Sequence, residues 1–172
     1  MISKAIASII PFLPKRLVWV FSHRYIAGET LQDAIDASKQ LNTEKNKVTI
    51  DLLGEFINDL AEAEEYKKAY LEIIDTFEKH NIEGSYSLKP TMFGLLLDSD
   101  VCYQNIRGIV QKAAQYNNFI RIDMEDSKCT DKEIELFKKL HNEFPKNTGL
   151  VFQAYLKRTF SDLEALSERH AN

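Results

Sequence analysis

The chain has little cysteine, no basic excess and no long uninterrupted apolar run. Its 172 residues include two cysteines, Cys102 and Cys129, which have neither the CxxC spacing of a zinc site nor enough partners for a disulfide framework. The formal net charge is −4, and no basic run is interleaved with aromatic residues. The cysteine spacing leads us to expect two ordinary thiols. Since phosphate binding needs a concentrated basic face, we expect no nucleic-acid partner.

The most apolar stretch, residues 2–20, is too short to cross a membrane. Pro11, Pro14, Lys15 and Arg16 interrupt it well before the roughly 20 residues that a spanning helix needs. Its isoleucines recur at helical spacing, which predicts an amphipathic helix docked on the domain. The alternative is a role at a membrane surface. We therefore expect a cytoplasmic protein, with a peripheral position at the inner face of the membrane as the alternative.

The rest of the chain alternates between strand-like and helix-like runs. Strands are expected to begin near Val48, Ser85, Phe119 and Leu150, in steps of 37, 34 and 31 residues, which is the length of one βα unit. We accordingly divide the chain into an N-terminal helical region, residues 1–46, and a barrel region, residues 47–172. Strand and helix in alternation predict a parallel sheet.

The helices are expected from apolar periodicity and from their starting residues. Capping boxes are predicted at Thr30 with Asp33 and at Thr130 with Glu133, and a last helix is predicted to start at Thr159. Between the first two strands, apolar residues recur at the spacing of a one-sided helix: Tyr66, Ala69, Tyr70, Ile73, Ile74 and Phe77. Val110, Ala113 and Ala114 mark the next helix.

The two faces of the expected strands differ sharply. One is apolar, with Val48, Ile50, Leu52, Tyr86, Leu88, Ile120, Ile122, Leu150 and Phe152, whereas the other carries Thr49, Asp51, Ser85, Ser87, Lys89, Arg121, Asp123, Val151, Gln153 and Tyr155. A doubly wound sheet needs both faces apolar, but a barrel has a lumen that can be polar. We predict an α/β fold of the (βα)8 TIM-barrel type. About four units are present, preceded by helices, since a complete barrel needs about 250 residues.

Three polar residues fall toward the carboxyl ends of their strands, where barrels of this type place their chemistry. Lys89, Asp123 and Gln153 would supply a cation, an anion and an amide to one pocket, which suits a zwitterionic ligand. The structural alternative is an internal network in which Arg121 bridges Asp51 and Asp123, because buried charges must be paired whatever their purpose.

Other signals for cofactors are weak. Asp123, Glu125 and Asp126 are hard ligands for magnesium or calcium, but no further carboxylate or histidine joins them at ligand spacing, so we expect no metal. Gly54 follows a strand without the companions of a GxGxxG loop. We expect Gly54 to form a tight turn at the end of the strand.

The strand ends also carry motifs that resemble one family. These are Asp51-Leu52-Leu53-Gly54-Glu55, Ser87-Leu88-Lys89-Pro90-Thr91, Arg121-Ile122-Asp123-Met124-Glu125-Asp126-Ser127 and Gln153-Ala154-Tyr155-Leu156. Together, and in this order, they resemble the bacterial monofunctional proline dehydrogenases. The resemblance runs along essentially the whole chain.

The resemblance implies a function and a set of site residues. Members of that family use FAD to oxidise L-proline to 1-pyrroline-5-carboxylate in proline catabolism and pass the electrons to membrane quinone. By motif match, Lys89 would pair with the substrate carboxylate, and Asp123 would be the acidic catalytic residue that orients substrate-clamping arginines. Met124 and Gln153 would contact the flavin.

The later motifs of the family, including its C-terminal tyrosine and paired arginines, are absent from these 172 residues. The chain is thus expected to be the N-terminal half of the enzyme and incomplete for catalysis alone. Two hypotheses follow. One is an enzyme fragment that works with its missing C-terminal half. The other is a non-catalytic half-barrel that serves as a scaffold or interaction protein and that pairs with a partner or with itself.

Overall fold

The computed structural model describes residues 14, 19–20, 26–28 and 30–167. The elements in chain order are α3 (Leu31–Thr43), β1 (Val48–Asp51), α4 (Leu60–Lys79), β2 (Gly84–Leu88), the 3-10 helix η2 (Pro90–Phe93), α5 (Ser99–Gln115), β3 (Ile120–Ile122), α6 (Thr130–Glu143), β4 (Thr148–Leu150) and α7 (Thr159–Ser167). The amphipathic helix expected in residues 2–20 lies almost entirely outside the described residues. Among the described helices, none is long and apolar enough to cross a membrane.

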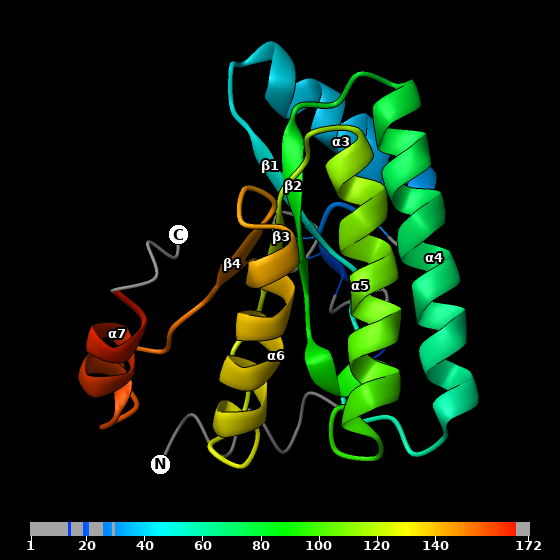
Figure 1. The fold of residues 1–172 in the computed structure, drawn as a ribbon. Helices are drawn as coiled ribbons and strands as arrows, with labels where there is room; N and C mark the ends of the chain where they lie inside the picture. Colours follow the sequence, from blue (N-terminus) through cyan, green and yellow to red (C-terminus); the bar gives the residue numbers. More distant parts are fainter. Residues whose placement is uncertain (1–13, 15–18, 21–25, 29, 168–172) are drawn as a thin grey trace.

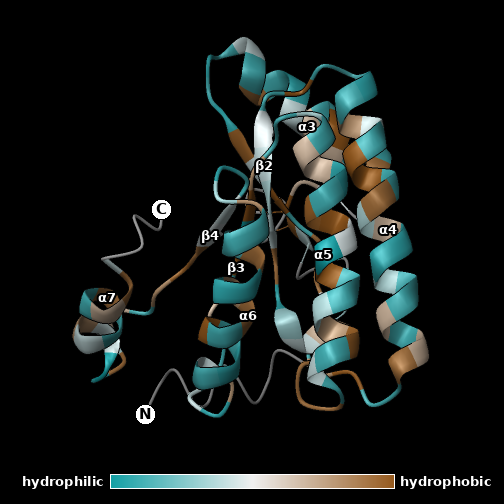
Figure 2. Ribbon diagram, viewed as in Figure 1, coloured by the Kyte–Doolittle hydropathy of each residue, from teal (hydrophilic) through white to brown (hydrophobic). Residues whose placement is uncertain are grey.

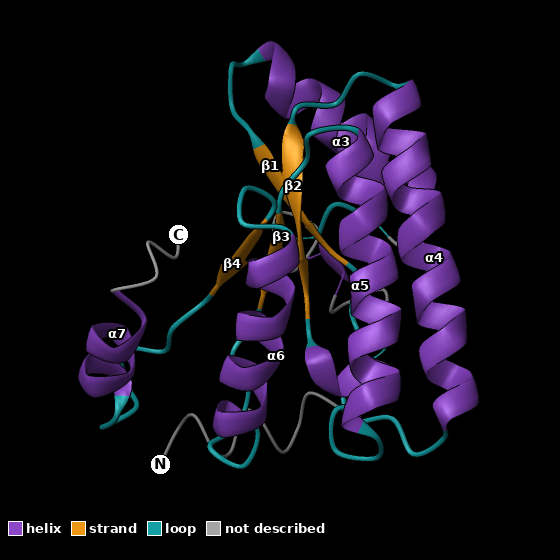
Figure 3. Ribbon diagram, in the orientation of Figure 1, coloured by secondary structure: helices purple, strands orange, loops and turns teal. Residues whose placement is uncertain are grey.

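The four strands form one parallel sheet in the order β1-β2-β3-β4, as the alternation of elements predicts (Figure 1, Figure 3). Three of them begin within one residue of the predicted position. β4 begins at Thr148, two residues earlier than predicted. Thr148 and Gly149 look like turn residues in the sequence, yet they pair with Ile120 and Arg121 of β3. Because β4 ends at Leu150, Gln153 lies beyond the strand rather than within it.

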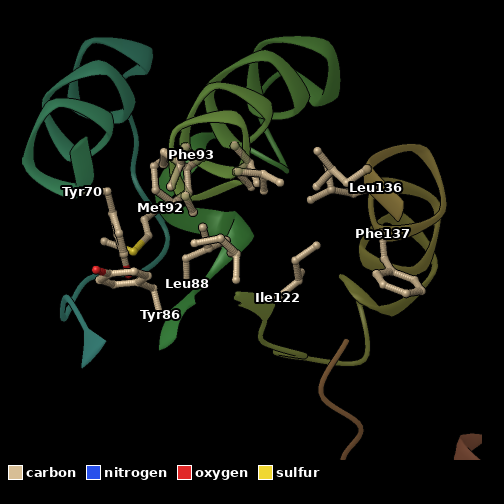
Figure 4. Packing of buried hydrophobic residues seen from close by; sticks show 14 of the residues in the cluster. Tyr70, Tyr86, Leu88, Met92, Phe93, Ile122, Leu136 and Phe137 are labelled. Carbon is tan, nitrogen blue, oxygen red and sulfur yellow. The ribbon is translucent and has the colours of Figure 1, made fainter. Parts of the chain in front are cut away.

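Helices cover the apolar face of this sheet. α4, α5 and α6 lie side by side, with polar residues on their outer surfaces (Figure 1, Figure 2). Their inner surfaces pack on the strands in one core. Figure 4 shows residues of both layers in this core, among them Tyr70, Phe93 and Phe137 from the helical segments and Tyr86, Leu88 and Ile122 from the strands. Burying these side chains is the main source of stability, at about 1.5–3 kcal/mol for each large one.

β1 and β3 bury alternate residues, as the prediction of two unlike faces requires, whereas β2 and β4 each bury neighbouring residues as well. In β1 the apolar Val48 is buried while Thr49 is exposed, and in β3 Arg121 is exposed between two buried isoleucines. One face is thus sealed by helices, and the other is polar. Each unit follows the strand-then-helix order of a TIM-type barrel.

The predicted capping box at Thr30 and Asp33 is present, with both reciprocal hydrogen bonds. The one predicted at Thr130 and Glu133 is wrong. α6 begins at Thr130 with Cys129 as its N-cap, so the threonine lies inside the first turn, where its hydroxyl has no hydrogen-bond partner among the described residues. The Glu133 carboxylate accepts instead from the backbone N–H of Glu125, farther upstream.

Gly54 serves close packing in the loop after β1. A Cβ atom at this position would lie 2.9 Å from Met92 Cε and 2.9 Å from Tyr66 Oη. Its φ is not in the left-handed region that favours glycine. The expected tight turn is therefore replaced by a close approach of the β1–α4 loop to α4 and η2.

Candidate active site at the carboxyl ends of the strands

The polar face of the sheet is organised in layers, because parallel register brings equivalent positions together. In the lower layer, Thr49 Oγ1 lies 3.2 Å from Ser85 Oγ, which accepts a hydrogen bond from Arg121 Nη1 at 2.9 Å. Thr49 and Ser85 are directly paired across β1 and β2, whereas Arg121 is paired with Ser87 and its side chain reaches back to Ser85. The next layer, nearer the carboxyl ends, contains Asp51, Ser87 and the backbone position of Arg121.

Lys89, the first residue after β2, turns back over that upper layer. Its Nζ donates to Asp51 Oδ2 at 3.1 Å. Burial lowers the pKa of Lys89, but the hydrogen bond and charge of Asp51, with the charges of Asp123 and Glu55, outweigh it and leave the pKa raised. Lys89 is therefore a fixed cation on the polar face, half-buried and still reachable.

Asp123, the first residue after β3, lies on the same face. Its Oδ1 accepts from the Ser87 hydroxyl at 2.5 Å, and its backbone N–H donates to the Leu88 carbonyl at 2.9 Å. Lys89 contacts Asp51 and Asp123 contacts Ser87, and because Asp51 and Ser87 are directly paired, the strand ends of β2 and β3 bring a cation and an anion to one part of this face.

Arg121 does not bridge the two aspartates, so that structural interpretation is wrong in its partners. The guanidinium donates to Ser85 and lies over the Phe119 ring, 5.4 Å from its centroid. Within the part of the chain that the structure describes, it forms no salt bridge. Lys89 takes the place at Asp51 that the sequence pattern assigned to Arg121.

Gln153 is tied to the segment that follows β3. Its Nε2 donates to the backbone carbonyls of Met124 at 2.7 Å and Glu125 at 3.0 Å. The Met124 side chain is buried in the hydrophobic core, so its backbone is the part that faces Gln153. The residues that motif matching assigned to the flavin are in contact with one another.

Glu125 and Thr91 were missed as site residues by reasoning from the sequence. Glu125 accepts from both the backbone N–H of Thr91, at 2.9 Å, and its hydroxyl, at 2.5 Å. Thr91 Oγ1 in turn accepts from the backbone N–H of Phe56 at 3.0 Å. Burial raises the pKa of Glu125, and the two bonds from Thr91 oppose that effect. The signal available was position, since each residue lies two places after a predicted one, Lys89 or Asp123.

These bonds join the ends of all four strands. From β4 to β1, the order is Gln153 to Glu125, Glu125 to Thr91, and Thr91 to Phe56. We call this set the strand-end chain. It fixes the loops after β1, β2, β3 and β4 relative to one another. The relative positions of Lys89 and Asp123 are set by it, because each belongs to one of these loops.

Tyr70 supports the site from α4, on the helix-covered face of the sheet. Its hydroxyl, on α4, donates to the Ser87 carbonyl at 2.6 Å and accepts from the backbone N–H of Leu52 at 3.3 Å. Burial raises the pKa of Tyr70. The apolar helical pattern predicted its burial but not the use of its hydroxyl.

The arrangement suits recognition rather than nucleophilic attack. A fixed ammonium and a carboxylate on one face can bind the two charges of an amphoteric molecule. Among the described residues, no group of three or more histidine, cysteine, aspartate or glutamate side chains is placed to hold a metal ion. Cys102 and Cys129 are both free and buried, and burial raises the pKa of each thiol.

Comparison with known proteins identifies the family. A family model described as proline dehydrogenase matches residues 34–171. The chain belongs to the proline dehydrogenase family. It is 33% identical over 147 residues to proline dehydrogenase 2 of Bacillus subtilis strain 168, covering 86% of this chain and 48% of that protein. It is 32% identical over 164 residues to the proline dehydrogenase of Deinococcus radiodurans, covering 93% of this chain and 53% of that protein.

A solved structure supports the same fold. The match is to a crystal structure of the proline utilization A protein of Bdellovibrio bacteriovorus, a protein that had been inactivated by N-propargylglycine. The TM-score is 0.78 and the sequence identity is 24%. The match covers 90% of this chain and 19% of that one. The predicted fold class, α/β of the (βα)8 TIM-barrel type, is confirmed. The chain spans about half the length of the curated proline dehydrogenases that it matches.

Proposed function

We propose that the chain is part of an FAD-dependent enzyme that oxidises L-proline to 1-pyrroline-5-carboxylate. The observation that carries this proposal is the Lys89 ammonium, held 3.1 Å from Asp51 on the same polar face as Asp123. It occurs at the strand ends, where barrels of this type hold their substrates, in a chain of the proline dehydrogenase family.

In this proposal Lys89 binds the carboxylate of proline. Proline is a zwitterion at neutral pH, and the raised pKa of Lys89 keeps its ammonium charged there. Asp123 is the acidic catalytic residue. Ser87 holds it through Oδ1, and Oδ2 takes no hydrogen bond from the described residues, which suits the orientation of cationic groups. Holding the ring in one orientation is the contribution that a redox site of this kind requires from the protein.

FAD is the proposed cofactor, with Met124 and Gln153 as its contacts. Because Gln153 donates through Nε2 to two carbonyls, its orientation is fixed and its Oε1 is left as an acceptor that takes no hydrogen bond from the described residues. An oriented amide carbonyl fits an N–H group on the edge of the flavin ring. When bound, FAD would accept a hydride from proline. Membrane quinone is the proposed electron acceptor.

The proposal includes a second half. In the described structure, β1 and β4 each pair on one side only, and an eight-unit barrel needs four further units. We propose that residues 47–172 form four barrel units, that residues 1–46 form a helical region before them, and that activity requires the other half. The proposed location is cytoplasmic or peripheral at the inner face of the membrane.

The one-sided strands also favour a second candidate, a half-barrel that acts as a scaffold or self-associates. Unpaired edge strands present backbone N–H and C=O groups to other chains. For the purified 172-residue chain we expect self-association in sedimentation, little retained flavin absorbance and no proline oxidation. A compact yellow monomer that oxidises proline would show that the second half is dispensable.

The test is complementation. The chain is co-expressed with the C-terminal half of the Bacillus subtilis relative, and proline-dependent reduction of a dye is measured. We expect activity that depends on both halves. In Lys89→Ala, KM for proline should rise by at least ten-fold, while Asp123→Ala should lower kcat. Lys146→Ala is the matched control, since this exposed lysine lies at the opposite ends of the strands. Equal proline oxidation by all variants would contradict the assignments.

A further inference from the structure

Glu133 is a buried acid that the proposed chemistry does not use. It lies in the first turns of α6 and is fully buried. Its Oε1 accepts from the backbone N–H of Glu125 at 2.9 Å, whereas its Oε2 has no partner within the described part of the chain. A buried carboxyl group with a single hydrogen bond is costly unless its position serves a purpose.

The bond is made to the segment that carries the site. Residues 123–129 connect β3 to α6 and include Asp123 and Met124. Gln153 holds the carbonyls of this segment, and Thr91 holds its Glu125 side chain. Glu133 binds the Glu125 N–H. Both the N–H and the C=O of Glu125 are thereby fixed, from α6 and from the loop after β4.

We infer that Glu133 is a positioning residue, which acts through the Glu125 backbone to hold Asp123 and Met124 at the end of β3. The inference rests on the proposed function for the roles of those two residues. The hydrogen bond itself does not depend on that function.

The surroundings make this contact sensitive to pH. Burial, more than any other cause, raises the pKa of Glu133 to about 7, and the carboxylates of Glu125, Asp126 and Asp123 add to the shift. Cys129, at the N-cap of α6, feels the Glu133 charge in turn. Cys102, on the neighbouring helix α5, has a thiol pKa that burial and the charge of Glu125 raise and the charge of Lys132 lowers. The charges that raise the pKa of Glu133 are all negative.

Ionisation should therefore change the contact near neutral pH. A carboxylate accepts a stronger hydrogen bond than a carboxylic acid does. As pH rises through about 7, the Glu125 amide proton is expected to move downfield, and the amides of Asp123 and Met124 should move with it. The segment would differ between the two protonation states of a group that does not touch substrate or cofactor.

The test is a pH titration of the ¹⁵N-labelled full chain by NMR, from pH 5 to pH 9. We expect the Glu125 amide to titrate with a midpoint near 7 in the unmodified chain and in the control Glu135→Gln, which alters an exposed glutamate of the same helix. In Glu133→Gln this titration should vanish. Its persistence in that variant, or a Glu125 amide that does not respond between pH 5 and pH 9 in the unmodified chain, would overturn the inference.

Hydrogen exchange measured by mass spectrometry gives an independent readout that tolerates self-association. Glu133→Ala should speed exchange in the peptide covering residues 123–129 by at least ten-fold relative to Glu135→Ala. Equal exchange in the two variants would contradict a positioning role. Neither measurement uses proline or flavin, so its outcome is separate from that of the complementation experiment.

Discussion

Lys89 and Asp51, 38 positions apart in the sequence, form an ion pair of 3.1 Å across the ends of β2 and β1. With side-chain exposures of 22% and 31%, the pair is neither fully buried nor free in water, so it contributes little to stability, at most about 1 kcal/mol. What it does is hold the ammonium in place and charged.

Asp51→Asn tests that role. Without the carboxylate, burial is left as the main influence on Lys89, so its pKa should fall. NMR of the lysine side chains measures this, and the free energy of unfolding should change by less than about 1 kcal/mol. Asp75→Asn is the control, since Asp75 pairs with Lys112 instead. An unchanged pKa of Lys89 would mean that Asp51 does not hold it.

Thr91→Val breaks the strand-end chain in its middle. Valine can neither accept from the Phe56 N–H nor donate to Glu125, and position 91 is buried. We expect a loss of about 1–3 kcal/mol in the free energy of unfolding, measured with denaturant. Thr43→Val removes one local hydrogen bond at an exposed helix end and should cost less. Equal costs would argue against the chain of bonds.

Glu133→Gln should alter the pH dependence of stability. The folded protein raises the pKa of Glu133 from 4.5 to about 7, so folding favours the protonated form. The stabilisation is fully present below about pH 4.5 and is lost as pH rises through about 7. Glutamine does not titrate. The variant should thus gain about 1–3 kcal/mol relative to the unmodified chain between pH 4.5 and pH 8. A pH-independent difference between the two would refute the shifted pKa.

Gly54 and Gly108 should respond oppositely to alanine. At Gly54, the new methyl group would meet Met92 and Tyr66 at 2.9 Å, which should cost about 1–3 kcal/mol. At Gly108, inside α5, it would meet only the flexible end of Lys67 at 3.2 Å, and the better helix propensity should stabilise the fold by about 0.5–1 kcal/mol. Thermal unfolding of both variants measures this. A neutral Gly54→Ala would mean that the β1–α4 loop is loosely packed.

The sheet could be predicted because its information is local. Alternation in runs such as Val48 to Leu52 reports two faces, and the periodicity of α4 reports one. The site partners could not be predicted so fully. Whether Asp51 pairs with Lys89 or Arg121 depends on where a side chain turns after its strand ends. The same holds for Glu133, whose capping motif is matched in sequence but displaced by the one-residue difference in where α6 begins.

In the proposed enzyme, this half of the barrel supplies Lys89 as the binding group for the carboxylate of proline. The most direct measurement is anaerobic bleaching of flavin absorbance as proline is added to the protein completed with the relative's second half. We predict bleaching in the unmodified protein and in Lys146→Ala, and at least ten-fold more proline for half-bleaching in Lys89→Ala. Half-bleaching at the same proline concentration in all three would show that Lys89 does not bind proline.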